Sequence, residues 1–212
     1  MGISRVPSFA EEKQLRQQGY RYIAGVDEVG RGALAGPVLA AAVIMPFMLK
    51  ATWRKEVRDS KLLSPAQRES LYEPIHNTAL AVGIGSSDVW TIESLGIVRA
   101  TELAMEQAVK QLSPRADAVL IDYMKVPGIK LPQKGVADGD TLCFSIACAS
   151  IIAKVTRDRM MEELDRTHPG YLFAQHKGYG TEEHLACLRK LGPCQIHRRT
   201  FQPVRDVLNF RD

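Results

Sequence analysis

The hydrophobic pattern of the chain alternates between short continuous runs and helical repeats. Four continuous apolar runs have the length of buried strands and are bounded by turn residues: residues 22–26, 38–45, 79–84 and 118–121. Between the third and fourth runs, small apolar residues recur at three- and four-residue spacing, which predicts a helix over residues 92–112. Strands that are followed by helices are typical of an α/β fold.

Two further helices are predicted from their end signals. Ser8 has the position of a capping residue, so a helix is expected over residues 8–18. A long helix is expected from about residue 141 to about residue 167, with an apolar face along its first half. Three basic residues are expected on the polar side of that helix: Lys154, Arg157 and Arg159.

The remaining segments complete the predicted organisation. Residues 124–139 hold two prolines and three glycines and are expected to be irregular. The tail is predicted to pack back onto the body of the protein through Phe201 and Val204. We therefore expect one domain over residues 1–212, with a core at about 20–168 and a C-terminal helical extension at about 169–212.

Composition narrows the class of protein. The hydrophobic content of 45% and the charged content of 25% are ordinary for a globular protein. No apolar run approaches the roughly 20 residues that span a bilayer, and the first residues lack the apolar region of a signal peptide. We expect a cytoplasmic monomer with reduced cysteines, because no Cys-x-x-Cys pair is present. A net charge of +4 permits a polyanionic partner without indicating one.

Two adjacent carboxylates stand where the first apolar run ends. Asp27 and Glu28 come directly after that run, and a glycine-rich turn follows at residues 30–32. A buried carboxylate costs several kcal/mol unless a cation or hydrogen-bond donors compensate it. Glycines let the backbone adopt a positive φ and let a ligand approach the backbone N–H groups. This arrangement favours a functional site.

Two more acids hold comparable positions. Asp122 follows the fourth apolar run, and Asp140 comes just before the long helix. Functional sites of α/β folds gather near strand ends. Clustered carboxylates repel one another unless a divalent cation neutralises them, and ligands that are all oxygens favour Mg²⁺ or Mn²⁺ over zinc. Two such ions can activate a water and steady the leaving oxygen in phosphodiester hydrolysis.

The stretch from residue 27 to residue 38 reads D-E-V-G-R-G-A-L-A-G-P-V. It resembles the signature of ribonuclease HII, the type 2 ribonuclease H. The blocks IACASIIAKVTRDRMM and IHRRTFQPV resemble the same family, and the similarity runs from Tyr22 to about Val204. The resemblance implies an α/β ribonuclease H-like fold, with a mixed five-stranded sheet flanked by helices and a C-terminal helical extension.

The resemblance also implies an activity. A protein of this family is an endoribonuclease that hydrolyses the RNA strand of RNA/DNA hybrids and cuts 5′ of single ribonucleotides embedded in duplex DNA. The expected products carry 3′-hydroxyl and 5′-phosphate ends. The expected cofactors are two divalent ions, Mn²⁺ or Mg²⁺, and the expected partners are the hybrid and the ribonucleotide-containing duplex.

The same resemblance implies roles for the four acids. Asp27 would bridge the two ions, Glu28 and Asp122 would complete one metal site, and Asp140 would belong to the other. Asp138 stands two residues before Asp140, but the Gly-Asp pair of the family motif falls on Asp140. Neighbours on an ideal strand point to opposite faces. Asp27 and Glu28 are therefore expected to share one ion only if the strand ends, bends or bulges there.

Substrate contacts are implied for a second set of residues. The turn Gly30-Arg31-Gly32 would contact the ribose 2′-hydroxyl and the neighbouring phosphates. Tyr179, in the loop HKGYGT, would stack on the sugar after the ribonucleotide and so demand a deoxyribose. Lys61 would contact a phosphate.

Two of these positions also have an interpretation without a substrate contact. Lys61 is also compatible with a solvated surface lysine, and Tyr179 with a packing residue. The pair Arg198-Arg199 is expected to touch phosphates. Tyr123 stands where the family usually has glycine, which puts the geometry of the loop after Asp122 in doubt.

Three other functions would share part of this pattern. A different nuclease of the same fold, such as a junction resolvase, would need the acids but has no use for the glycine-arginine turn together with Tyr179. A nucleotide-binding module would need the Gly-Lys-Ser/Thr ending of a P-loop, which is missing from the turn. A nucleic-acid binder without activity should have lost at least one acid, and all four are present.

Overall fold

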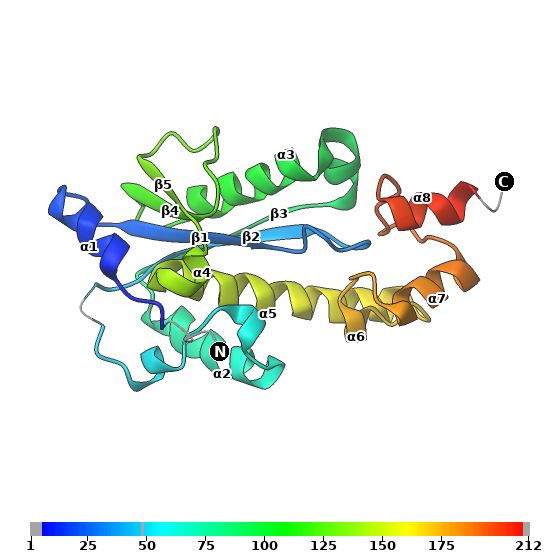
Figure 1. The fold of residues 1–212 in the computed structure, drawn as a ribbon, viewed down its shortest axis with the longest axis horizontal. Helices are drawn as coiled ribbons and strands as arrows, with labels where there is room; N and C mark the ends of the chain where they lie inside the picture. Colours follow the sequence, from blue (N-terminus) through cyan, green and yellow to red (C-terminus); the bar gives the residue numbers. More distant parts are fainter. Residues whose placement is uncertain (1–5, 48, 210–212) are drawn as a thin grey trace.

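The computed structural model describes residues 6–47 and 49–209, so the first residues, on which the signal-peptide expectation rests, lie outside the described part. A mixed five-stranded sheet forms the centre, in the order β3-β2-β1-β4-β5 (Figure 1). The strands are β1 Ile23–Val29, β2 Val38–Ile44, β3 Ala81–Ser87, β4 Ala118–Asp122 and β5 Gln133–Val136. β2 pairs antiparallel with β1 and β3, and β4 pairs parallel with β1 and β5. The predicted sheet is confirmed.

Helices cover both faces of the sheet. They are α1 Ala10–Gln17, α2 Pro65–Thr78, α3 Val89–Lys110, α4 Gly139–Leu142, α5 Phe144–Thr167, α6 Phe173–His176, α7 Glu182–Leu191 and α8 Gln202–Asn209, with short 3-10 helices η1 Thr52–Lys55 and η2 Ser60–Leu62. In Figure 1, α3 lies over one face of the sheet and α5 over the other, with α2 outside α5. The C-terminal helices α6, α7 and α8 lie together at the end of the molecule that the β1–β2 tip approaches.

Side chains of β2 supply both halves of the core. Leu39 and Val43 pack toward α5, whereas Ala42 and Ile44 pack toward α3. A strand buried on both faces reads as a continuous apolar run, which is why no alternation is visible in its sequence. On β1, α5 passes so close to Gly25 that an added Cβ would clash with the backbone of α5. This close crossing brings the first turns of α5 beside the end of β1.

Two local predictions were wrong, and two predicted helices are confirmed but are interrupted. The segment predicted to be irregular contains β5, a short strand at the sheet edge that has no apolar run of its own. The N-cap of α1 is Phe9 and not Ser8, which lies one residue earlier and forms a backbone bridge with Cys143. The helix α3 is kinked at Gly96, where φ is 77°. The expected single helix from residue 141 is two helices, because Cys143 is extended between α4 and α5.

No helix in residues 6–47 and 49–209 is both long enough and apolar enough to cross a membrane.

Candidate active site

Strand alternation brings two of the predicted acids to one face of the sheet. Along β1, Ile23 and Gly25 face α5, and Asp27 follows on the same face two residues later. The neighbouring parallel strand β4 presents Leu120 and then Asp122 to that face. Asp27 is only 5% exposed, and Asp122 is half-buried. Both line a cavity of about 210 Å³.

Glu28 lines the same cavity, although β1 neither ends nor bulges at Asp27. The pairing with β2 continues in regular register through Val29, so the expected break in the strand is wrong. The pairing with β4 stops at Val26, which leaves that edge of β1 open beyond this point. Glu28 is half-buried there, and its Oε1 accepts a hydrogen bond from Arg31 Nη1 at 3.4 Å.

Asp140 lies in α4, between β5 and α5. Its side chain is buried, whereas the alternative acid Asp138 is exposed. Lys61 Nζ lies 3.2 Å from Asp140 Oδ2, and Lys61 lines the cavity. The backbone N–H of Gly139 donates to Asp122 Oδ1 at 2.7 Å, which ties α4 to the end of β4. Asp140 is therefore connected to the cavity through Lys61 and Asp122.

Burial raises the pKa of three of the acids, and repulsion from neighbouring carboxylates adds to this effect. Burial, followed by repulsion from Glu28 and Asp122, raises the pKa of Asp27 well above its usual range. Burial raises the pKa of Asp122 to about 6, and repulsion from Asp140 and Glu28 adds to the effect. Burial also raises the pKa of Asp140, although Lys61 opposes this rise. The site therefore holds more negative charge than the surrounding protein neutralises.

The donor set fits a hard divalent cation. All four acids offer oxygen ligands, and a cation among them would relieve the repulsion that helps to raise the pKa values of Asp27 and Asp122. In the described part of the chain, no three His, Cys, Asp or Glu side chains already form a group that could hold a metal ion. Carboxylates on rotatable side chains would thus have to turn toward one another on binding.

Three residues that were not predicted as site residues also belong to the site. Ser150 and Lys154 of α5 line the cavity together with Ser60. The hydroxyls of Ser60 and Ser150 are 2.7 Å apart, and a hydrogen bond from Ser150 favours the charged form of Asp27. A signal was present, because Ser150, Lys154 and Asp158 recur every four residues in a mostly buried helix.

The glycine turn lies at the mouth of the cavity. Gly30 has a φ of 90°, and an added Cβ would clash with the guanidinium of Arg157, so only glycine fits. Gly32 does not have a positive φ, contrary to expectation, but it is exposed and an added Cβ would meet no atom within 4 Å. Open space around Gly32 is compatible with the approach of a ligand, and Arg31 beside it is half-exposed and lines the cavity.

Arg157 supports this turn from inside the protein. The prediction that it lies on the polar side of its helix was wrong, because the side chain is fully buried. Its guanidinium donates to the carbonyls of Pro37 at 3.0 Å, Lys177 at 2.9 Å and Ala35 at 3.1 Å. These carbonyls satisfy a charge that would otherwise be costly to bury.

Tyr179 is far from the acids in the sequence. In the structure it lines the same cavity as Asp27, Glu28 and Asp122. It is half-buried, and its ring centroid is 5.6 Å from Lys154 Nζ and 5.4 Å from Arg157 Cζ. Both distances are in the range of cation–π contacts. The ring is thus held by two cations of α5 while part of its surface stays open.

The Arg198-Arg199 pair is divided by the fold. Arg198 is fully buried, so the expectation that it touches phosphates is wrong. Its guanidinium donates to the carbonyls of Gly36 and Arg31. Arg199 is exposed and stays compatible with a phosphate contact.

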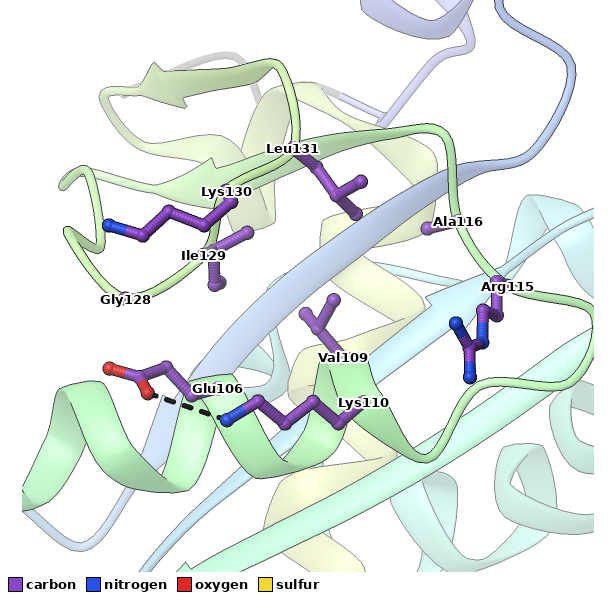
Figure 2. Close-up of a pocket in the computed structure, with 9 residues that line it drawn as sticks. All are labelled: Glu106, Val109, Lys110, Arg115, Ala116, Gly128, Ile129, Lys130 and Leu131. Carbon is purple, nitrogen blue, oxygen red and sulfur yellow. Dashed lines mark ion pairs between the residues drawn. The ribbon is translucent and has the colours of Figure 1, made fainter.

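A second hollow, of about 360 Å³, lies between α3 and the segments on either side of β4 (Figure 2). Its floor is apolar, with Val109, Ile129 and Leu131, and it contains one acid, Glu106. Glu106 is paired with Lys110 at 3.8 Å and with Arg99 at 2.8 Å, so its charge is already compensated. None of the predicted site residues lines this hollow.

Comparisons with known proteins show the family to which the chain belongs. The chain matches the family model of ribonuclease HII over residues 24–204. The chain belongs to the ribonuclease HII family. Its similarity to the ribonuclease HII of Dehalococcoides mccartyi strain BAV1 is 58% identity over 203 residues, which are 96% of each chain.

Solved structures confirm the ribonuclease H-like fold of this family member. The crystal structure of ribonuclease H2 from Pyrococcus horikoshii superposes with a TM-score of 0.74 at 23% identity, covering 91% of this chain and all of that one. The Mn²⁺ complex of the ribonuclease HIII named Bst-RNase HIII superposes with a TM-score of 0.70 at 19% identity. It covers 89% of this chain and 70% of the other.

Proposed function

We propose that this chain cuts a duplex on the 5′ side of a ribonucleotide and leaves 3′-hydroxyl and 5′-phosphate ends. As a member of the ribonuclease HII family, it is an endoribonuclease that cleaves RNA in RNA/DNA hybrids and at ribonucleotides embedded in DNA. One observation carries the proposal. A single cavity is lined by three buried or half-buried acids, by Gly30 and Arg31 of the glycine turn and by Tyr179.

The family depends on divalent metal ions, and a structural relative was solved with Mn²⁺. In our proposal Asp27, Glu28 and Asp122 hold one ion, and Asp27 and Asp140 hold a second. Bound Mn²⁺ or Mg²⁺ would supply positive charge at the phosphate and would favour the hydroxide form of the attacking water. Lys61 is exposed over most of its side chain, so it is free to leave Asp140 when a cation takes its place.

The chain's own residues would orient the substrate. The open backbone at Gly32 and the half-exposed Arg31 suit contacts with a ribose 2′-hydroxyl and its phosphate. The ring of Tyr179 would stack on the next sugar, where a second 2′-hydroxyl would be obstructed. A ribonucleotide followed by a deoxyribonucleotide satisfies both contacts at once. Lys154 and Lys61, which line the same cavity, add positive charge near the phosphates.

The test is a duplex that carries one ribonucleotide, incubated with Mn²⁺, with Mg²⁺ or with a chelator. We expect cleavage only with a divalent ion, at the 5′ side of the ribonucleotide, with ends that a ligase can rejoin. Asp138→Asn, at an exposed acid two residues from Asp140, should cleave like the unchanged protein. Cleavage in the chelator, or products with a cyclic phosphate, would show that a different chemistry operates.

A further inference from the structure

The two substrate-reading elements are joined to each other by the backbone of the C-terminal segment. Gly178 accepts hydrogen bonds through its carbonyl from the backbone N–H groups of Leu34 at 2.7 Å and Ala35 at 3.3 Å. Leu34 in turn accepts from the N–H of Arg198 at 2.8 Å, and Gly36 donates to the carbonyl of residue 196 at 2.8 Å. The chain after the glycine turn, the Tyr179 loop and residues 196–198 therefore form one hydrogen-bonded unit.

Arg198 anchors one side of this unit. Its Nε and Nη2 donate to the carbonyl of Gly36 at 3.0 and 2.8 Å, and its Nη1 donates to the carbonyl of Arg31 at 2.8 Å. The guanidinium is fully buried, so these contacts are not shared with solvent. The side chain of Arg198, which is distant in the sequence, thus fixes the backbone of the glycine turn from inside the protein.

The neighbouring residue, His197, anchors the other side. Its Nδ1 accepts from the backbone N–H of Cys194 at 3.0 Å, so its proton is on Nε2. That Nε2–H donates to His184 Nε2 at 3.1 Å. His184 must then carry its own proton on Nδ1, which donates to the carbonyl of Tyr179 at 2.9 Å. The hydrogen bonds run in one direction from Cys194 to Tyr179, and each tautomer is determined by its neighbours.

A second imidazole reinforces the same loop. The ring of His176 stacks on that of His184 with centroids 4.2 Å apart and an interplanar angle of 10°. Its Nδ1 accepts from the N–H of Gly178 at 3.2 Å, and its Nε2–H donates to the carbonyl of Tyr171 at 2.8 Å. The rings of His184 and His197 are almost fully buried. No phosphate or water of the cavity has access to them, so they are not candidates for proton transfer to substrate.

We propose that His184 and His197 are positioning residues that hold Tyr179 at a fixed distance from the Gly30–Gly32 turn, and that this distance sets the preference for the RNA-to-DNA junction. The inference rests on the proposed function of Tyr179 and of the turn. His197 and Arg198 are adjacent in the chain. His197 then holds the Tyr179 loop through His184, and Arg198 holds the glycine turn. A loop without this anchor would keep the acids intact but would let the ring move away from the sugar.

A pair of variants at one position separates this role from folding. His184→Leu fills the space but leaves the Tyr179 carbonyl without its donor, whereas His184→Asn keeps an N–H at the position of Nδ1. Both lose the contact with His197, so both should lose stability in urea unfolding, and the leucine variant should lose more because a carbonyl is left without its donor. The measurement is the ratio of junction to interior cleavage on one chimeric RNA–DNA strand paired with DNA.

We expect His184→Leu to lower that ratio by about fivefold or more, with the rate of interior cleavage within about threefold of the unchanged protein. His184→Asn should keep the ratio within about twofold. If the leucine variant does not fold, His197→Asn, too short to reach His184, and His197→Gln, which can reach it, form a second pair with the same expectation.

The outcomes are distinguishable. If the unchanged protein cuts junction and interior equally, the proposed function of Tyr179 fails and the inference fails with it. If the unchanged protein prefers the junction and both variants of a pair keep that preference, the proposed function stands and the positioning role is overturned. If both variants lose it equally, the hydrogen bond to Tyr179 is not the determinant, and the inference is again overturned.

Discussion

The acids at the end of the sheet and the histidine–arginine cluster behind Tyr179 are both buried polar groups, but they are built in opposite ways. Asp27 and Asp122 lie beside like charges, and burial and repulsion raise their pKa values. His184, His197 and Arg198 are more deeply buried than Asp122, and their hydrogen-bond partners are neutral groups and backbone carbonyls instead of like charges. The first region lacks the positive charge that would balance its carboxylates. In the second region the buried polar groups are hydrogen-bonded, which holds them in place. We infer that one region is built to take up cations and the other to hold a shape.

The largest expected effect comes from breaking the acid region. Asp27→Asn removes a proposed ligand, so cleavage of a hybrid should fall at least about a thousandfold, as is usual when a central catalytic group is lost. Stability without divalent ions should rise, because a neutral amide replaces a buried carboxylate that two neighbouring acids repel. Single-turnover cleavage and urea unfolding measure the two effects. Near-normal turnover would remove Asp27 from the metal site.

The cluster behind Tyr179 should respond in the opposite sense, by losing stability. Arg198→Ala leaves the carbonyls of Gly36 and Arg31 without their buried donors, which should cost about 3 kcal/mol. The matched control is Arg199→Ala, because this neighbour is exposed and should change stability by no more than about 0.5 kcal/mol. Urea unfolding of both variants gives the comparison. Equal effects would mean that Arg198 is not buried as described.

The two regions also predict pH dependences of opposite sign. Burial lowers the pKa of His184 and His197 to about 4 in the folded protein. Their contribution to stability is therefore full above their unfolded pKa of about 6.5 and is lost as the pH falls to about 4. Burial raises the pKa of Asp122 to about 6. Its contribution is present below its unfolded pKa of about 3.8 and is lost as the pH rises to about 6.

Variants separate these two contributions. Without divalent ions, Asp122→Asn should steepen the loss of stability between pH 6.5 and pH 4, because the Asp122 contribution that opposes the histidine contribution is removed. His184→Asn should flatten it. Unfolding free energies measured at several pH values test both. If neither variant changes the slope, the two regions do not titrate as buried groups.

The smallest expected effect concerns the backbone beside Asp122. Tyr123 has a φ of 62° and its side chain is 80% exposed. A bulky residue is strained in this conformation, whereas glycine is not. Tyr123→Gly should therefore raise stability by at most about 1 kcal/mol, and Tyr123→Phe should leave it unchanged. A stability loss on changing Tyr123 to glycine would show that the tyrosine side chain makes contacts that outweigh the strain.

Much of the acid region could be predicted from the sequence. Asp27, Glu28 and Asp122 follow apolar runs of strand length, and acids at strand ends are visible without coordinates. The fifth strand was missed because β5 lies at the sheet edge and its residues, Gln133–Val136, are not an apolar run. The regular pairing of β1 through Glu28 was also missed, since whether a neighbouring strand ends early depends on tertiary contacts.

The cluster behind Tyr179 could not be predicted in the same way. Arg157 and Arg198 look like surface residues in the sequence, but both are buried against backbone carbonyls of residues 31–37 and 177. Those carbonyls come from segments more than 100 positions away, apart from that of Lys177. No periodicity within one segment reports such contacts. The histidines were overlooked for the same reason, since His184 and His197 meet only in the fold.

The central claim is that the acids cut and that the turn and Tyr179 decide where. It is tested most directly by Tyr179→Ala on a single chimeric strand that carries both an RNA-to-DNA junction and an RNA interior, with Tyr179→Phe as the control that keeps the ring. The account predicts that the ratio of junction to interior cleavage falls about 5- to 160-fold in the alanine variant, the equivalent of one lost stacking contact of about 1–3 kcal/mol. The phenylalanine variant should keep the ratio of the unchanged protein. An alanine variant that retains the full junction preference would contradict the account, because the junction would then be read elsewhere.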